Sequence, residues 1–507
     1  MFGNRCFERI KTLPPLLVEC DRDKGCSREA DRLFIKQKNG SEDEAALLKQ
    51  ADPPQTGGRR QINPLREFRV GDCRIFLQQS ENGAIPRFEF DHSNYLPQSG
   101  SFVAGNLKNA PVNRAVSWNL FFEACNDDII QREDSMRIGV PKEIKNNEFR
   151  VGLVPSSVAE LVHNGHQVTV ETQAGMGAGV TDADYVAAGA TISASAEDIF
   201  ANSDMIVKVK EPLAVERKRL KKGQILFTYL HLAPDAEQTK DLIASGATCI
   251  AYETVTAATG GLPLLTPMSE VAGRLAPQVG AHSLEKAAGG RGVLLGGVPG
   301  VPAAEVVILG GGVSGTHAAM IALGMGANVT VVDRSAEVLR RISAQFNGAV
   351  RTAFSTRDAV QDLAKTADLL IGCVLVPGAE APKLITRAML KTMKPGSVIV
   401  DVAIDQGGCC ETSKATTHSD PTYVVDGVIH YCVANMPGAV ARTSTFALNN
   451  GTLPFALALA NKGWKQALID DKHLRNGLNV HDGKVTCKPV ADAQGLSYTS
   501  AESILGL

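Results

Sequence analysis

Residues 305–335 read EVVILGGGVSGTHAAMIALGMGANVTVVDRS and contain the most specific structural pattern of the chain. An apolar strand ends at Gly310-x-Gly312-x-x-Gly315, a helix follows, and a second apolar strand ends at Asp333. The three glycines permit a tight turn, close approach of the backbone to a pyrophosphate, and close packing of the helix, whose first N–H groups face the phosphates. Asp333 lies 23 residues after Gly310, where a carboxylate accepts hydrogen bonds from the hydroxyls of an adenosine ribose. The stretch predicts a dinucleotide-binding unit that favours NAD, because a carboxylate repels the 2′-phosphate of NADP.

The alternation of apolar strands and amphipathic helices continues on both sides of this unit. It begins at Met136, and a long helical pattern covers TPMSEVAGRLAPQVGAHSLEKAA. Such alternation is typical of parallel sheets covered by helices. We therefore predict an α/β fold with two Rossmann-like doubly wound domains joined by long helices. The substrate domain is discontinuous, residues 136–263 plus 442–507, and the NAD-binding domain covers 264–441. Within the first domain, PSSVAELVHNG predicts a helix with a serine cap that ends at Gly165.

Residues 1–135 differ in texture, because they show no sustained helical or strand periodicity. The stretch KQKNGSEDEAALLKQADPPQTGGRRQINP is polar, carries both charges and is interrupted by proline and glycine. CRIFLQQ and SWNLFFEAC are apolar enough for local strands or helices, but they are too few for a core. The pattern predicts a largely disordered N-terminal extension.

Composition excludes several classes of protein. The chain has 507 residues, 44% of them hydrophobic, and a formal net charge of -2, so no nucleic-acid partner is indicated. We find no apolar run of the roughly 18 residues that a membrane helix needs and no secretion signal, which predicts a cytoplasmic protein. The eleven cysteines are an odd number, and the adjacent Cys409 and Cys410 lack zinc-ligand spacing. We expect reduced thiols and no metal site.

Four polar side chains stand where open α/β sheets bind ligands. Lys208 and Lys210 lie two apart on a predicted strand, His231 ends another strand, and Asp405 follows a third. Arg150 offers a planar fork that matches a carboxylate. Taken singly, each has a simpler interpretation: a lysine reaching solvent, a packing histidine, an aspartate that starts a turn, and a surface salt bridge.

Together these segments resemble bacterial alanine dehydrogenase. The resemblance runs from Met136 almost to Leu507 and rests on MRIGVPKEIKNNEFRVGLVP, KVKEP, LHLA, PLLTPMSEVAGRLAPQVGA, GGRGVLLGGVPGV, VLVPGAEAPKL, VAIDQGG and YCVANMPGAV. It implies reversible oxidative deamination of L-alanine to pyruvate and ammonia with NAD, in subunits that form homohexamers. Members of the family begin near Met136, so we expect the enzyme to begin there.

The resemblance also implies roles for individual residues. Arg150 and Lys210 bind the substrate carboxylate and carbonyl, while His231 and Asp405 manage protons and the attacking water, in a division that stays open. The remaining positions are expected to contact the cofactor: Ser269, Gly310, Gly312, Val313, Ser314, Gly315, Asp333, Ser355, Val374, Leu375, Val433, Asn435 and Met436.

Three other interpretations share the nucleotide-binding pattern. The nucleotide-binding subunit of transhydrogenase lacks the histidine of LHLA, which is His231 here. Saccharopine dehydrogenase is disfavoured by MSEVAGRLAPQVGA. A non-catalytic NAD sensor would be expected to lose one of Arg150, Lys210, His231 or Asp405, and the chain has all four.

Overall fold

The computed structural model describes residues 66–70, 73–78, 87–91, 101–102, 135–374 and 380–507. The chain divides into two compact units, residues 1–130 and 131–507. No helix of the described residues is long and apolar enough to cross a membrane.

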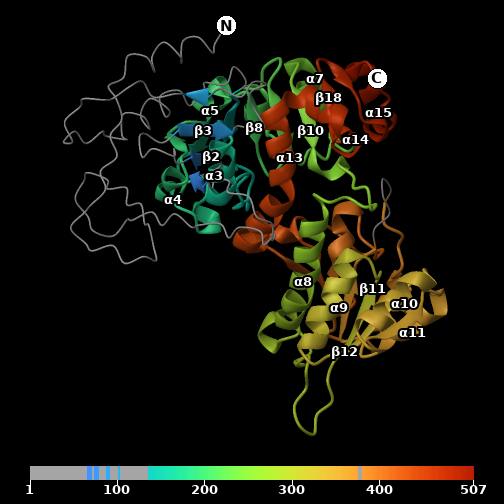
Figure 1. Ribbon diagram of the computed structural model, residues 1–507. Helices are drawn as coiled ribbons and strands as arrows, with labels where there is room; N and C mark the ends of the chain where they lie inside the picture. The colour runs from blue at the N-terminus through green and yellow to red at the C-terminus, as the bar shows by residue number, and fades with distance from the viewer. Residues whose placement is uncertain (1–65, 71–72, 79–86, 92–100, 103–134, 375–379) are drawn as a thin grey trace, which may run out of the picture. The chain divides into compact units, whose positions relative to one another are not determined.

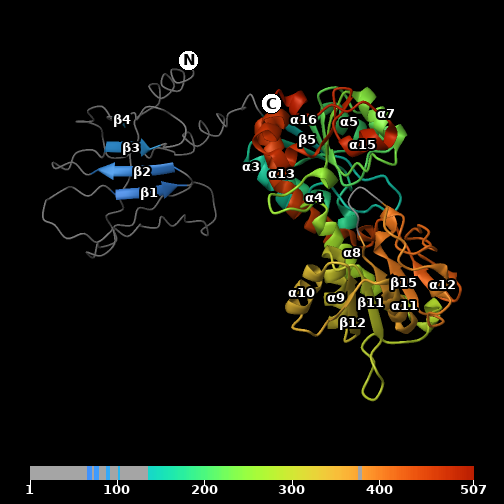
Figure 2. The same ribbon diagram turned by 90° about the vertical axis from the view of Figure 1, so that its right-hand side faces the viewer.

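The described part of the N-terminal unit is a four-stranded antiparallel sheet in which neighbours in sequence are neighbours in space. Its strands, labelled in Figure 2, are β1 (Arg66–Val70), β2 (Cys73–Gln78), β3 (Arg87–Asp91) and β4 (Ser101–Phe102). The prediction of a local strand in CRIFLQQ is confirmed by β2. SWNLFFEAC and the polar stretch before residue 65 lie outside the described residues.

The second unit contains two large sheets, and the first has eight strands in the order β19-β18-β10-β9-β8-β5-β6-β7. Six of them are parallel; β18 pairs antiparallel with β10 at the edge of these six, and β19 pairs antiparallel with β18. The strands are β5 (Arg137–Val140), β6 (Gln167–Glu171), β7 (Thr191–Ser193), β8 (Met205–Val207), β9 (Ile225–Thr228), β10 (Thr248–Ala251), β18 (Leu478–His481) and β19 (Lys484–Val485). The C-terminal segment therefore returns to complete the first sheet.

Helices cover both faces of this sheet over two clusters of buried apolar side chains. They are α3 (Pro155–His163), η1 (Met176–Ala178), α4 (Asp182–Ala187), α5 (Ala196–Asn202), α6 (Ala214–Arg217), α7 (Ala236–Ser245), η2 (Tyr252–Thr254), α14 (Lys472–Arg475), α15 (Lys488–Gln494) and α16 (Ala501–Leu505).

The start of α3 corrects one prediction. Its N-cap is Val154, with no side-chain cap, and Pro155 occupies the first turn. Proline supplies a helical φ and lacks the N–H that a serine cap would satisfy, so the predicted serine cap was wrong. The end of the helix is as predicted, since Gly165 follows the C-cap Asn164 with a φ of 89°.

The second large sheet has seven strands in the order β13-β12-β11-β14-β15-β17-β16, all parallel except β16. The strands are β11 (Glu305–Leu309), β12 (Asn328–Asp333), β13 (Arg351–Phe354), β14 (Leu369–Gly372), β15 (Val398–Asp401), β16 (Thr422–Val425) and β17 (Val428–Tyr431). Numbered along the chain, the parallel strands of both large sheets run 3-2-1-4-5-6, the order of doubly wound dinucleotide-binding folds. The predicted fold class is confirmed.

Helices also cover this sheet on both faces, again over buried apolar clusters. They are η3 (Lys286–Ala288), α9 (Val313–Gly324), α10 (Ala336–Gln345), α11 (Arg357–Thr366), α12 (Arg387–Leu390), η4 (Val402–Gln406) and η5 (Met436–Val440). Two long helices, α8 (Thr266–Ser283) and α13 (Ala441–Asp470), connect the sheets in sequence and pack against each other (Figure 1).

Candidate active site

The glycine loop after β11 has the geometry expected from its sequence. Gly310 has a φ of 97°, and a Cβ there would lie 2.7 Å from the carbonyl oxygen of Cys373. A Cβ on Gly315 would overlap the carbonyl oxygen of Gly310, so glycine is needed for α9 to approach β11. A Cβ on Gly312, by contrast, would meet nothing within 4 Å. The tight turn and the close helix packing are thus confirmed, and open space lies at the position predicted to face a pyrophosphate.

Asp333 ends β12 beside this loop, half-buried. Its Oδ2 accepts a hydrogen bond from the backbone N–H of Gly311 at 2.8 Å, and Oδ1 accepts one from the N–H of Ser335 at 2.8 Å. The N–H of Ser355, the next predicted contact, donates to the carbonyl of Asp333 at 3.0 Å. The carboxylate is therefore held at the carboxyl edge of the sheet, where the ribose of a dinucleotide lies in this fold.

Helix α8 brings a further predicted residue to the loop. The carbonyl of Ser269 accepts a hydrogen bond from the Ser314 hydroxyl at 2.9 Å. A Cβ on Gly273 would overlap the Ser314 carbonyl, so α8 and α9 are in close backbone contact. Val313 is 41% exposed at the start of α9 and is free to contact a ligand.

The other predicted cofactor positions differ in accessibility. Val374 follows β14 and its backbone lies against Gly310, at the point where the strand order reverses. Leu375 is outside the described residues. The side chains of Val433 and Met436 are buried in the apolar cluster of the second sheet, so contact with a cofactor there would fall to backbone atoms.

Arg150 is 2% exposed and makes a network of bonds rather than a surface salt bridge. Its Nε and Nη2 donate to the two carboxylate oxygens of Glu148 at 2.7 and 2.6 Å. Nη2 also donates to Asn435 Oδ1 at 2.7 Å, and Nη1 contacts the sulfur of Met268 at 3.1 Å. The guanidinium lowers the pKa of Glu148 to about 2 against the opposing effect of burial.

The two lysines near β8 have different environments, which corrects a second prediction. The strand ends at Val207, so neither lysine lies on it. Lys208 is fully buried, and its ammonium pairs with Glu143 at 3.0 Å and with Glu216 at 2.8 Å. Lys208 is therefore a structural residue.

Lys210 is half-buried, and among the described residues no pair of carboxylates holds its ammonium in this way. Burial lowers its pKa, and the positive charge of Arg150 acts in the same direction, while Glu211 and Asp405 oppose it. Its backbone N–H donates to Glu143 Oε1 at 3.3 Å. Glu143 follows β5 and Lys210 follows β8, so Lys210 lies at the strand-order reversal of the first sheet.

His231 lies beyond the end of β9, which stops at Thr228, so the prediction that it ends the strand was wrong. It is exposed and adopts a left-handed backbone with a φ of 50°. The carboxylate of Glu253 holds this conformation by accepting the N–H of His231 at 2.6 Å and that of Leu230 at 3.2 Å. The imidazole stacks on the ring of Tyr229 with centroids 5.7 Å apart.

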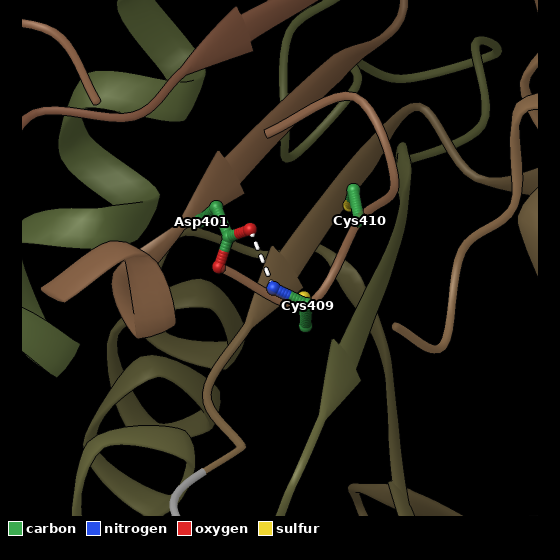
Figure 3. Close-up of side chains that lie close together, drawn as sticks. All are labelled: Asp401, Cys409 and Cys410. Carbon is green, nitrogen blue, oxygen red and sulfur yellow. Dashed lines mark hydrogen bonds between the residues drawn. The ribbon is translucent and has the colours of Figure 1, made fainter. Parts of the chain in front are cut away.

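Asp405 is exposed on η4, directly after β15. The carboxylate of buried Asp401 accepts hydrogen bonds from backbone N–H groups on both sides of Asp405. The N–H of Ala403 donates at 3.1 Å, and that of Cys409 donates at 2.8 Å (Figure 3). The ligand atoms of Asp401, Cys409 and Cys410 lie within 4.8 Å of one another. Hydrogen bonding with Cys410 and burial raise the pKa of the Cys409 thiol, which disfavours the thiolate that a metal requires.

The predicted catalytic and substrate-binding residues gather at the carboxyl edges of the two sheets. Lys210 interacts electrostatically with both Arg150 and Asp405, and Arg150 interacts with Tyr229, on which His231 stacks. Sequence reasoning missed three buried residues at this edge, namely Glu143, Glu148 and Tyr229. The two glutamates had one signal, their charge in the segment PKEIKNNEFR, which also carries Arg150. Tyr229 had none that we could identify.

Two domain models of one known family match most of the second unit. Residues 139–272 match the N-terminal domain model, and residues 276–488 the C-terminal domain model, of alanine dehydrogenase/PNT. The chain belongs to the alanine dehydrogenase/PNT family.

Relatives within this family are similar over most of the chain. An alanine dehydrogenase of Halomonas elongata is 62% identical over 73% of this chain and 100% of its own length. One from Mycobacterium tuberculosis strain H37Rv is 52% identical over the same shares. A solved L-alanine dehydrogenase superposes with a TM-score of 0.69 at 55% identity, covering 71% of this chain and 99% of its own. A transhydrogenase from Sinorhizobium meliloti gives a TM-score of 0.61 at 26% identity, covering 69% and 99%.

Proposed function

We propose that this protein is an NAD-dependent alanine dehydrogenase, which converts L-alanine to pyruvate and ammonia reversibly. The main support is electrostatic: Lys210 interacts with both Arg150 and Asp405, and these residues follow strands at the edge that ligands occupy in this fold. His231 is linked to them through Tyr229, on which it stacks and which interacts with Arg150. The glycine loop and Asp333 fit NAD, since the loop leaves space at Gly312 and the carboxylate lies at the ribose position.

In the proposed mechanism, Arg150 and Lys210 bind the substrate carboxylate and fix the Cα toward the cofactor. Bound NAD would supply the hydride acceptor for this Cα. Because the two cations hold the substrate in one orientation, the bimolecular step becomes effectively unimolecular. Such positioning is the main contribution that a protein makes to this chemistry. The lowered pKa of Lys210 is compatible with this role, because the incoming carboxylate favours its charged form.

His231 and Asp405 manage the protons. Water adds to the iminium carbon of the oxidised substrate, and one of these two residues accepts the proton that the water loses. Transfer of a proton to the nitrogen then lets the C–N bond break and ammonia leave, while one of the two residues accepts the hydroxyl proton of the carbinolamine and the carbonyl of pyruvate forms. Both residues are exposed, which suits groups that exchange protons in each cycle.

The domain and assembly assignments belong to the same proposal. Residues 136–263 with 442–507 form the substrate domain, residues 264–441 bind NAD, and the protein acts in the cytoplasm as a homohexamer. Self-association is supported by a projecting loop before β11, drawn yellow-green in Figure 1, which carries Leu294, Val298 and Val301 at 67%, 51% and 59% exposure. Exposed apolar side chains of this kind mark interaction surfaces.

The test is a spectrophotometric assay of NADH formation with L-alanine and NAD, and of the reverse reaction with pyruvate and ammonia. We expect activity that depends on both alanine and NAD. Hydride transfer between NADH and an NADP analogue, without any activity on alanine, would instead indicate a transhydrogenase subunit and overturn the proposal. Light scattering of the same sample measures the oligomer.

A further inference from the structure

We propose that Glu148 is a positioning residue, which holds the guanidinium of Arg150 so that one edge of it is presented to the substrate carboxylate. The inference rests on the proposed function, because it takes Arg150 as the group that binds that carboxylate. Glu148 itself would not touch the substrate.

The geometry of the pair supports this role. Glu148 is 5% exposed and grips the side edge of Arg150 through Nε and Nη2, at 2.7 and 2.6 Å. The same carboxylate accepts the backbone N–H of Arg150 at 3.0 Å. Side chain and backbone of Arg150 are therefore fixed by one carboxylate two residues away, and the planar guanidinium keeps only its end edge, Nη1 with Nη2, for other partners.

Two neutral acceptors contact that end edge. They are the sulfur of Met268, 3.1 Å from Nη1, and the amide oxygen of Asn435, 2.7 Å from Nη2. A carboxylate binds a guanidinium more strongly than either, since both of its oxygens accept charge-assisted hydrogen bonds. The substrate therefore displaces them.

Asn435 is oriented by the same carboxylate. Its Nδ2 donates to Glu148 Oε2 at 3.0 Å, which points its oxygen toward Arg150. Asn435 lies 287 residues from Glu148 in sequence, just before η5. Glu148 thus connects the carboxylate-binding arginine to a predicted cofactor contact, so it aligns the two ligands with each other.

The experiment compares Glu148→Gln with the unmodified full chain. Glutamine keeps the size but presents an NH₂ group where a carboxylate oxygen met the guanidinium. We expect the KM for L-alanine to rise roughly 10- to 100-fold, the range for losing a buried charge-assisted pair, with kcat changed by less than about threefold and the Kd for NAD unchanged.

Two further variants separate positioning from general structural damage. Asp368→Asn is the matched control: Asp368 is also buried and pairs with Arg291 at 2.9 Å, but it precedes β14 and so lies at the opposite edge of its sheet. It should lower the melting temperature and leave the KM for alanine unchanged. Glu148→Asp keeps the charge but is too short to grip both nitrogens, so it should also raise the KM, and it replaces the glutamine variant if that one does not fold.

The outcomes are distinguishable. A folded Glu148→Gln or Glu148→Asp enzyme with a KM within about twofold of the unmodified enzyme overturns the positioning role and leaves the proposed function standing. An equal rise in KM in Asp368→Asn would also overturn it, because the effect would then be nonspecific. An unmodified protein that does not oxidise alanine overturns the proposed function, and the inference with it.

Discussion

The two large sheets have the same strand order, but the segments that follow their first strands, β5 and β11, differ in charge. After β11 the chain forms an uncharged loop, in which glycines bring the backbone close to its neighbours. After β5 it forms a segment that places Glu143, Glu148 and Arg150 in buried ion pairs. One topology thus offers backbone N–H groups in one copy and fixed charges in the other. The segments after the strands, rather than the fold, therefore determine which ligand each sheet can bind.

The buried ion pairs of the first sheet are better understood as geometry than as stability. Removing charges from water costs about as much as their mutual attraction returns, so such pairs contribute little net free energy. They do fix where Lys208 and Arg150 lie, because each cation has two or more hydrogen bonds to carboxylates. We therefore expect the first sheet to bind the substrate and the second to bind NAD, and changes in one sheet should leave the function of the other intact.

The largest effect should come from His231→Ala. We expect turnover to fall by roughly 10²-fold or more, the usual result of losing a positioned acid or base, while the Kd for NAD stays the same. Folding should survive, because Glu253 holds the backbone of residue 231 rather than its ring. Steady-state kinetics and NADH fluorescence titration measure both quantities. If His231→Ala weakened NAD binding as much as it lowered turnover, the proposal that the first sheet handles the substrate and the second binds NAD would be wrong.

Acid should weaken the first sheet through Glu148. Its pKa is about 2 when folded and 4.5 ordinarily, so its contribution to stability is complete above pH 4.5 and is lost as the pH falls toward 2. Relative to a protonated Glu148, its ionised form stabilises the folded protein by about 3 kcal/mol at neutral pH, a comparison that leaves out the cost of burying the pair. The gap in melting temperature between the unmodified protein and Glu148→Gln should therefore be constant from pH 7 to 5 and shrink below that. A gap independent of pH down to pH 3 would contradict the assignment.

The glycine loop offers a matched pair of alanine substitutions. Gly312→Ala enters open space, so the protein should keep its melting temperature while the KM for NAD rises roughly tenfold or more through contact with the pyrophosphate. Gly315→Ala overlaps the Gly310 carbonyl and should lower the free energy of unfolding by about 1–3 kcal/mol. If both variants changed the KM for NAD and the melting temperature to the same degree, Gly312 and Gly315 would not have the separate roles of ligand contact and helix packing.

A smaller effect is expected at the end of β12. Asp333→Ala should narrow the preference for NAD over NADP by roughly tenfold, since the like-charge repulsion of a 2′-phosphate is removed. The ratio of kcat/KM for the two cofactors measures it. Equal efficiency with NAD and NADP in the unmodified enzyme would mean that Asp333 has little influence and would direct attention to neighbouring Arg334.

The smallest effect should follow from removing residues 1–135. Both large sheets and all the proposed site residues lie in 136–507, so this shorter protein should oxidise alanine at a rate within about twofold of the full chain. Its melting temperature should change little. An insoluble or inactive product would show that the first 135 residues are an integral part of the enzyme.

The sequence was informative where the determining interactions are local. The turn at the glycine loop, the strand that ends at Asp333 and the helix α8 were predicted correctly, because strand, turn and helix signals fall within a few residues of one another. The serine cap of α3 failed because Pro155 starts the helix without a side-chain cap.

The partners of buried charges were not predictable, because they are distant in sequence. Lys208 was placed on a strand with Lys210, yet its carboxylates come from Glu143, 65 residues earlier, and from Glu216. The contact of Arg150 with Asn435 spans 285 residues. No periodicity reports such pairings, so the environments of these cations required the structure.

The return of the C-terminal segment to the first sheet has a consequence for synthesis on the ribosome. Strand β10 is made early, but its neighbour β18 begins only at Leu478, after the whole second sheet has been translated. The nascent chain therefore carries an unpaired strand edge throughout that interval, and such edges invite pairing with other chains. The first sheet can gain β18 only after Leu478 has been translated. At roughly 5–20 residues per second, translation from Ala251 at the end of β10 to Leu478 takes roughly 10–45 s, and the edge of β10 stays unpaired for that time.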